Sequence, residues 1–231
     1  MFLIISLMTL LEAYLNNDMS AWQATIDDAR WETLCDDEKI NIINTEYGYI
    51  ATLLDEAPTG CKQSKSDKSA RKAQAQHYLD AFINHIEDAK DILPESRYCM
   101  YLSGAYAYKF MLTGNISAGV KSFQLCHDAV EKDPKDPLAL TLVGNVEFYA
   151  PKLLGGSKKK ALEHFNAAKT YIQAPQYDLW WNKPALYLCL IQCYEKMGQK
   201  EKALTTAKAL LQSYPNFIYL RDTYLPQLEE Q

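Results

Sequence analysis

The apolar residues of this chain recur every three or four positions along most of its length. A clear case runs from Ile40 through Ile43, Tyr47 and Ile50 to Leu54. Because an α-helix completes a turn in about 3.6 residues, this spacing places the apolar side chains on one helix face. Similar patterns return in the later segments, so the sequence predicts an all-α fold.

Four prolines divide the chain into units of almost equal length. Pro94, Pro134, Pro175 and Pro215 follow one another at gaps of 40, 41 and 40 residues. Self-similarity at a fixed period of about 20 to 50 residues is typical of solenoids, in which each repeat is one structural unit. We therefore predict a right-handed α-solenoid of stacked antiparallel helix pairs, forming a single domain over residues 1–231.

The turn signals between the helical patterns give the predicted boundaries. N-terminal helices occupy residues 1–35, and a cap helix that Pro226 interrupts occupies residues 217–229. The predicted helix pairs between them are 38–92, 96–133, 137–174 and 179–215.

The first eleven residues, MFLIISLMTLL, are apolar except for Ser6 and Thr9. One interpretation is the apolar region of a secretory signal, and the other is the first helix of the fold, continuing through Tyr14. A signal needs a basic start and small residues at a cleavage site, and neither follows here. A periplasmic or exported location and a cytoplasmic one therefore stay equally open.

The last predicted pair carries the most specific pattern, and it resembles the tetratricopeptide repeat. In that repeat, small residues let the second helix approach the first, large residues fill the groove to the next pair, and a proline ends the second helix. The residues that match are Tyr187, Leu190, Tyr194, Gly198, Ala203, Ala207, Leu210 and Pro215.

The resemblance covers residues 73–215 and is strong only over 184–215. The two middle units depart from it, because their period is near 40 residues rather than about 34. Extra residues between the two helices of each unit explain the difference. The stretch from Tyr149 to Leu162, YAPKLLGGSKKKAL, is also similar to an element of envelope-associated tetratricopeptide proteins of Gram-negative bacteria. That similarity implies a bacterial, periplasmic setting.

Composition and charge exclude some classes of function. The net charge of −5 lacks the basic excess that general binding to nucleic-acid phosphates requires. No apolar run reaches the length of about 18 residues that a membrane span needs. The six cysteines are spread along the chain without a C-x-x-C pair. Burial as small apolar residues is favoured over disulfides or metal binding, and their redox state stays open.

The chain also lacks the spacing of common catalytic and metal-binding motifs. It contains neither H-E-x-x-H nor a phosphate-binding loop, a dinucleotide fingerprint or G-x-S-x-G. Among its four histidines, His85 and His164 occupy equivalent positions of their predicted repeats, which repetition explains better than catalysis. We predict no enzyme activity, no catalytic residue, no metal site and no cofactor.

Aromatic residues gather on the first helix of each predicted pair, and in stacked helix pairs these helices line the concave face. Most of these rings are expected in the core between repeats, and the others on a binding groove, where Tyr and Trp are favoured. Trp180 and Trp181 are adjacent, so one is expected in the core and the other on the groove. The candidate groove residues are Tyr98, Tyr101, Tyr108, Tyr149, Trp180, Trp181 and Asn182.

Two polar segments are weaker candidates for anion binding. Ser157 is a predicted N-cap followed by Lys158, Lys159 and Lys160, where backbone N–H groups and lysines can hold an anion. A tight turn followed by a capped helix with solvated lysines is the alternative. The basic stretch 59–72 is interpreted as a solvated linker rather than an anion-binding loop.

The favoured functional hypothesis is a non-catalytic scaffold that holds a protein or peptide segment in its concave, aromatic groove. The alternative is an envelope protein that binds or helps transport a small or lipid-like ligand in a cavity beneath the loop 150–156. Self-association also stays open, because the ends of a solenoid are adhesive unless they are capped.

Overall fold

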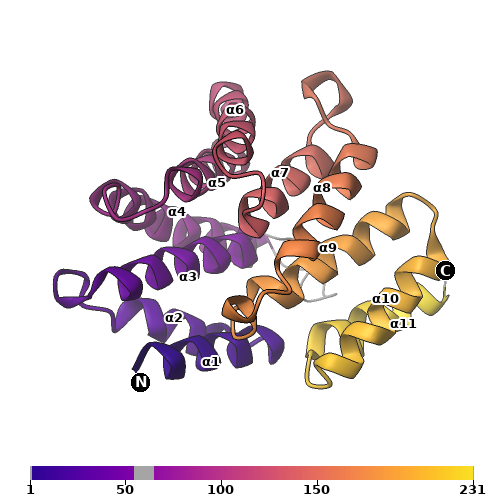
Figure 1. The fold of residues 1–231 in the computed structure, drawn as a ribbon. Coiled ribbons are helices and arrows are strands. Elements are labelled where there is room, and N and C mark those ends of the chain that lie inside the picture. Colours follow the sequence, from indigo (N-terminus) through magenta and orange to yellow (C-terminus); the bar gives the residue numbers. More distant parts are fainter. Residues whose placement is uncertain (1, 55–64, 231) are drawn as a thin grey trace.

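The computed structural model of this chain describes residues 2–54 and 65–230, and the regular structure of this part is all helical (Figure 1). Its eleven α-helices pack as sequential antiparallel pairs, which confirms the predicted all-α solenoid fold. The helices are α1 (Phe2–Leu15), α2 (Met19–Asp27), α3 (Asp36–Leu54), α4 (Lys65–Asp88), α5 (Glu95–Thr113), α6 (Ile116–Lys132), α7 (Pro137–Tyr149), α8 (Lys158–Tyr171), α9 (Asn182–Lys196), α10 (Lys200–Ser213) and α11 (Leu225–Glu230).

The four predicted helix pairs correspond in position to α3–α4, α5–α6, α7–α8 and α9–α10. The assignment of the whole chain to one domain stays a prediction. The basic stretch 59–72 lies partly outside the described residues, and from Lys65 onward it forms the first turns of α4.

Side-chain caps begin the helices that follow tight turns. The side chain of Asn115 accepts a hydrogen bond from Ala118 N at 3.2 Å, and that of Ser157 accepts one from Lys160 N at 3.3 Å. Asp136 accepts one from Leu138 N at 3.0 Å, beside Pro137 in the first turn of α7. These bonds satisfy N–H groups that have no partner inside the helix, so local sequence fixes where the helices begin.

Small residues bring the two helices of each pair together. Ala129, Ala168 and Ala207, one on the second helix of each later pair, are fully buried. In the third pair, Gly144 of α7 lies so close to Phe165 of α8 that a Cβ would be 2.5 Å from the ring. The alternation of small and large residues that the repeat pattern predicted therefore fills the interior at close packing.

Helix α1, at the N-terminal end of the chain, packs against the segment that follows α10. Leu10, Ala13 and Leu15 of this helix are buried. Leu15 belongs to the same apolar cluster as Phe217 and Leu220, which follow α10. Figure 1 shows α1 and the pair α10–α11 along the same side of the molecule. The apolar start of the chain, to the extent that its side chains are described, is thus a packed part of the fold.

Five residues meet at what we call the closing junction: Tyr14, Trp22, Tyr47, Gly48 and Trp181. The ring centroids of Trp22 and Trp181 are 5.2 Å apart, and Tyr14 lies 5.6 Å from Trp181. A Cβ on Gly48 would be 2.5 Å from Trp181 and 2.6 Å from Trp22, so only glycine lets α3 approach these rings. The N-terminal helices therefore cover the beginning of α9 instead of leaving it open.

A buried pair of amides fixes the same contact. Asn44 of α3 and Asn182 of α9 exchange two side-chain hydrogen bonds, of 2.9 and 3.2 Å, although 138 residues separate them. Both side chains are buried, so each amide satisfies the other where water does not reach.

The C-terminal segment, for which the sequence predicted a cap helix interrupted at Pro226, has its irregular stretch before this proline, which itself lies in the first turn of α11. Leu220–Tyr224 is π-helical and Leu225–Glu230 returns to α-helix. Proline lacks an N–H and collides with the preceding turn, and a wider turn accommodates it.

Candidate functional site

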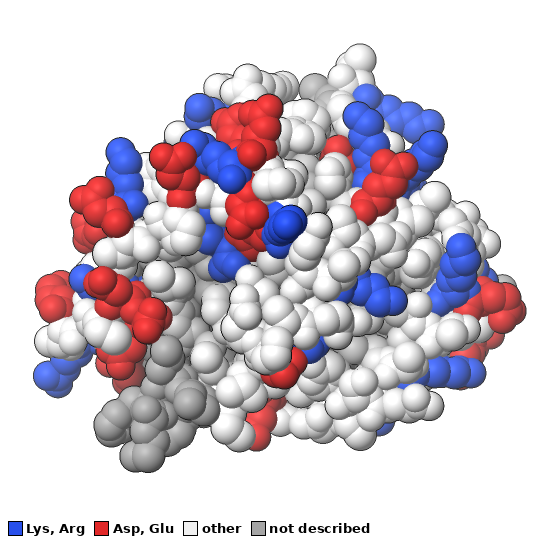
Figure 2. Space-filling view, in the orientation of Figure 1, with Lys and Arg blue, Asp and Glu red and all other residues white. Residues whose placement is uncertain are grey.

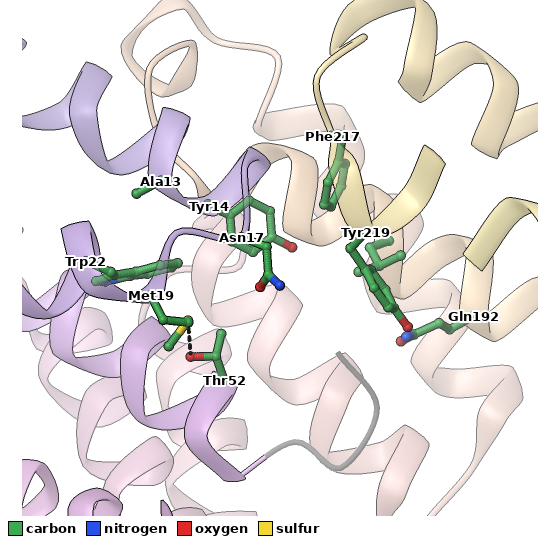
Figure 3. Close-up of a pocket in the computed structure, with 10 residues that line it drawn as sticks. Ala13, Tyr14, Asn17, Met19, Trp22, Thr52, Gln192, Phe217 and Tyr219 are labelled. Carbon is green, nitrogen blue, oxygen red and sulfur yellow. Dashed lines mark hydrogen bonds between the residues drawn. The ribbon is translucent and has the colours of Figure 1, made fainter. Parts of the chain in front are cut away.

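A narrow cleft lies where the N-terminal helices meet α9 and the segment after α10 (Figure 3). We call it the seam cleft, and its volume is about 80 Å³. In Figure 3, Tyr14 and Asn17 lie between Trp22 and Met19 on one side and Phe217 and Tyr219 on the other. Leu188 and Gln192 of α9 and Thr52 of α3 complete most of its wall.

The apolar wall of the seam cleft is mainly aromatic. The rings of Tyr14 and Phe217 are 5.3 Å apart, and those of Tyr14 and Trp22 are 5.9 Å apart. Trp22 donates its indole N–H to the carbonyl of Thr45 at 3.0 Å, which fixes the plane of its ring. Trp22 and Phe217 are only 1% and 2% exposed, so they are largely covered by the chain itself. The half-buried rings of Tyr14 and Tyr219 are the ones that a flat ligand can stack on, and neighbours that fix these rings reduce the conformational entropy lost on binding.

Tyr219 is supported from outside the cleft by Tyr224. Their rings stack with centroids 6.0 Å apart, and Tyr224 donates its hydroxyl to Glu195 at 2.5 Å. Burial, with Glu195 beside it, raises the pKa of Tyr224 above its ordinary value, so this phenol stays protonated as a donor.

The polar groups of the cleft are few. Thr52 donates its hydroxyl to the sulfur of Met19 at 3.4 Å and to the carbonyl of Tyr49 at 2.7 Å. Arg71 of α4 donates to the carbonyl of Thr52, which places a guanidinium near this wall. An apolar cleft with a thioether, an amide and a nearby cation suits an amphipathic ligand better than a highly charged one.

Four of the seven candidate groove residues lie in the interior. Tyr101 and Tyr108 of α5 are buried, and Tyr108 donates its hydroxyl to the carbonyl of Tyr47 at 2.7 Å. Trp181 is 7% exposed, and Asn182 is held by Asn44. The physical reason is that α3 packs against α5 and α9, so these side chains contact the chain itself instead of a partner.

The other three candidates reach the surface. Tyr149 is 69% exposed, whereas Tyr98 and Trp180 are half-buried. Tyr98 donates to Glu87 at 3.2 Å, and Trp180 lies against the guanidinium of Arg97 at 5.7 Å. Of the two adjacent tryptophans, one is in the core and one is partly open, which is the arrangement expected for neighbouring residues. Partner binding by the exposed candidates stays a prediction.

The loop before α8 contains the weaker anion-binding candidates. Ser157 serves as the N-cap of α8, and Lys158, Lys159 and Lys160 are exposed in its first turn. Leu153 is 94% exposed instead of covering a cavity, and the ring of Phe123 lies directly beneath Gly155. The side chain of Leu154 is outside the described part of the structure. No residue of the loop 150–156, under which the alternative hypothesis placed a cavity, is among those that line the seam cleft.

Two buried glutamates explain the repeated histidines. Glu46 of α3 accepts a hydrogen bond from His85 Nδ1 at 2.9 Å, and Glu147 of α7 accepts one from His164 Nδ1 at 2.9 Å. Burial raises the pKa of Glu46, and the hydrogen bond and charge of His85 only partly oppose this. Burial lowers the pKa of His127, whose ring lies 4.0 Å from Glu147. Repetition of a position in the fold accounts for the histidines, as the sequence suggested, but the glutamates were not foreseen.

Sequence reasoning missed the residues of the seam cleft. Met19, Thr52, Gln192 and Tyr219 belong to four different segments, and no motif or period links them. In the residues that the structure describes, no group of three or more His, Cys, Asp or Glu side chains is arranged to hold a metal ion. None of the described helices is long and apolar enough to cross a membrane.

Stacked helix pairs with alternating small and large contact residues define a tetratricopeptide-like α-solenoid. No protein family model matches the sequence, and no curated relative matches it either. Among solved structures, the chain is similar to the HusA haemophore from Porphyromonas gingivalis, with a TM-score of 0.50 and 14% sequence identity. The match covers 77% of this chain and 92% of the haemophore chain. At this identity the similarity concerns the fold.

Proposed function

We propose that this chain is a non-catalytic binding protein that takes a small, flat, amphipathic ligand into the seam cleft, and that haem is the first ligand to test. The observation that carries the proposal is the cleft itself, walled by Tyr14, Trp22, Phe217 and Tyr219 where the two ends of the chain meet. The similarity in fold to a haemophore supports the choice of a tetrapyrrole.

The side chains of the cleft have the chemistry that such a ligand uses. Aromatic rings stack on a porphyrin plane, and each well-placed pair contributes on the order of 1 kcal/mol. The thioether of Met19 and the phenol of Tyr219 are side-chain types that ligate haem iron in proteins. Arg71, near Thr52, supplies a positive charge suited to carboxylates at the ligand edge.

The present volume limits how the ligand enters. Pockets that enclose a drug-sized molecule measure roughly 300 to 1,000 Å³, whereas the seam cleft measures about 80 Å³. A tetrapyrrole therefore inserts one edge, or the N-terminal helices move away from α9 and Phe217 to admit more of it. The cleft lies between segments that are far apart in the sequence, so opening it would require separating the packed contacts of the closing junction.

Burial of the groove candidates favours this proposal over the peptide-binding scaffold. Tyr101, Tyr108 and Trp181 are enclosed by the chain's own helices, so they offer no surface to a peptide. The seam cleft is a concave surface with a mostly apolar lining, and none of these three residues lines it.

Titration of the purified chain with haemin, followed by the Soret band and by tryptophan fluorescence, tests the proposal. We expect saturable one-to-one binding that quenches the fluorescence of Trp22 and Trp181, which lie at the cleft and in the closing junction beside it. Tyr219→Ala is expected to weaken the affinity about tenfold, since it removes a stacking ring. Tyr98→Ala, outside the cleft, is the matched control and should leave the affinity unchanged.

Iron-free protoporphyrin separates stacking from ligation. If Met19 or Tyr219 binds the iron, Met19→Ala or Tyr219→Phe changes the Soret maximum with haemin but has little effect on protoporphyrin affinity. Equal binding of haemin by Tyr219→Ala and the unchanged chain, or no saturable binding of either tetrapyrrole, would rule the proposal out.

A further inference from the structure

The loop between α7 and α8 presents an apolar side chain away from the fold. Leu153 is 94% exposed at the centre of the short 3-10 turn Lys152–Leu154. An exposed leucine on a surface is common by itself. Its position at the tip of a projecting turn, close in sequence to four lysines, is what needs an explanation.

Hydrogen bonds and glycines hold this turn in shape. Gly155 N donates to Lys152 O at 3.2 Å, Gly156 N to Pro151 O at 3.1 Å, and Ser157 N to Glu147 O at 2.8 Å. Gly155 has φ +94°, which favours glycine, and a Cβ on Gly156 would collide with the carbonyl of Ala150. The backbone thus fixes the outward position of Leu153.

Four lysines flank the exposed leucine in the sequence. Lys152 precedes it, Lys158, Lys159 and Lys160 follow it, and all four are exposed. The first turn of α8 contains no acidic residue. Among the described residues, none of the four takes part in an ion pair. Figure 2 shows Lys and Arg side chains gathered at the upper right, with acidic side chains at the lower edge of the group. A chain of net charge −5 therefore carries a local basic surface.

We propose that residues 150–160, the lysine loop, dock this protein onto an anionic lipid surface. Leu153 enters the boundary between headgroups and acyl chains, and the four ammonium groups contact lipid phosphates while their stems lie along the apolar boundary. Charge complementarity selects the anionic lipid, and the rigid apolar tip selects a bilayer over a soluble anion. Each basic residue near such a surface strengthens binding about fivefold at ordinary ionic strength.

Co-sedimentation of the full chain with vesicles tests the proposal. Vesicles of phosphatidylcholine with about one third phosphatidylglycerol should retain the protein at low salt, whereas pure phosphatidylcholine should retain much less. The triple variant Lys158→Gln, Lys159→Gln, Lys160→Gln is expected to lower the partition coefficient by about two orders of magnitude. Leu153→Ser is expected to lower it about tenfold, because it removes the inserted side chain.

A matched pair of controls isolates the loop. Ile116 is also an exposed apolar residue, 66% exposed, and Lys121 is an exposed lysine, both on α6. Ile116→Ser and Lys121→Gln should leave the partition coefficient within about twofold. Circular dichroism and the thermal midpoint confirm that each variant is folded.

Three outcomes would overturn the proposal. One is equal retention on the two kinds of vesicle. Another is unchanged binding of the triple lysine variant. The third is loss of binding in the lysine variant but not in Leu153→Ser, which would show adsorption to any polyanion; soluble heparin would then compete with vesicles equally well for both proteins. None of these outcomes bears on haem binding at the seam cleft.

Discussion

The closing junction and the lysine loop both contain large apolar side chains next to turns. These side chains are buried at the junction and exposed in the loop. At the junction, Trp181 follows a short turn and is covered by helices from the other end of the chain. In the loop, Leu153 also lies in a short turn, but it stays 94% exposed. The difference arises from whether a distant segment packs over the turn.

The comparison shows why residue type alone is a poor guide to a binding surface in a solenoid. Aromatic residues on the first helix of each pair can contact a partner only where no other helix covers the concave face. Here α3 fills part of that face, and an aromatic residue counted as a groove candidate, such as Tyr108, becomes a core residue. The seam cleft and the lysine loop, for which binding is proposed, do not include these buried aromatic residues.

The largest effect is expected from the two adjacent tryptophans. Trp181→Ala leaves a cavity at the closing junction and should lower the free energy of unfolding by about 4 kcal/mol. Trp180→Ala removes a half-buried ring packed on Arg97 and should cost about 1 kcal/mol. Urea denaturation of both variants measures the difference. Equal losses of unfolding free energy in the two variants would contradict a larger contribution of Trp181 to packing at the closing junction.

A smaller effect is expected from the amide pair that spans the junction. Asn44→Ala leaves the buried amide of Asn182 without its partner and should cost about 2 kcal/mol. The double variant with Asn182→Ala should cost less than the sum of the single variants, because the two residues act as a unit.

Asn166 supplies the control for that pair. Its amide is exposed on α8 and bonds only locally, so Asn166→Ala should change the free energy of unfolding by less than about 0.5 kcal/mol. Strict additivity of the two junction variants in denaturation would contradict a coupled contact between α3 and α9.

The smallest effect on stability is expected from Glu46 of α3, which directly precedes Tyr47 and Gly48 of the closing junction. Burial raises its pKa, so between the ordinary glutamate pKa and the raised value the folded chain keeps a proton that the unfolded chain has released. Its contribution to the free energy of unfolding therefore falls as pH rises through this window. Relative to Glu46→Gln, the unchanged chain should become less stable as the pH rises from low to neutral.

Glu95 serves as a control, because its contribution to stability should change with pH in the opposite direction. This exposed carboxyl contacts Lys132, which lowers its pKa, so any stability it adds is lost as pH falls. Thermal unfolding from acid to neutral pH measures how the stability of the chain depends on pH when either carboxyl is replaced. A difference between the Glu46 variant and the unchanged chain that does not vary with pH would be inconsistent with the raised pKa.

Local features of the sequence predicted a large part of the fold. The proline period and the predicted cap Ser157 both act within a few residues of where they stand in the chain. Such effects can be predicted because caps and prolines change the conformation of their own turn. The candidate site was less predictable, since the walls of the seam cleft come from helices at both ends of the chain.

The sequence by itself determined that this protein is built from helix pairs, where capped helices such as α8 begin, and that it lacks the common catalytic motifs. Tertiary structure alone decided which aromatic residues are buried, that Asn44 meets Asn182 across 138 residues, and that Leu153 is left uncovered. The physical reason is the range of the interactions. Helix periodicity and capping are local, whereas burial depends on which distant segment packs over a face, and in a solenoid whose ends meet that segment lies at the far end of the chain.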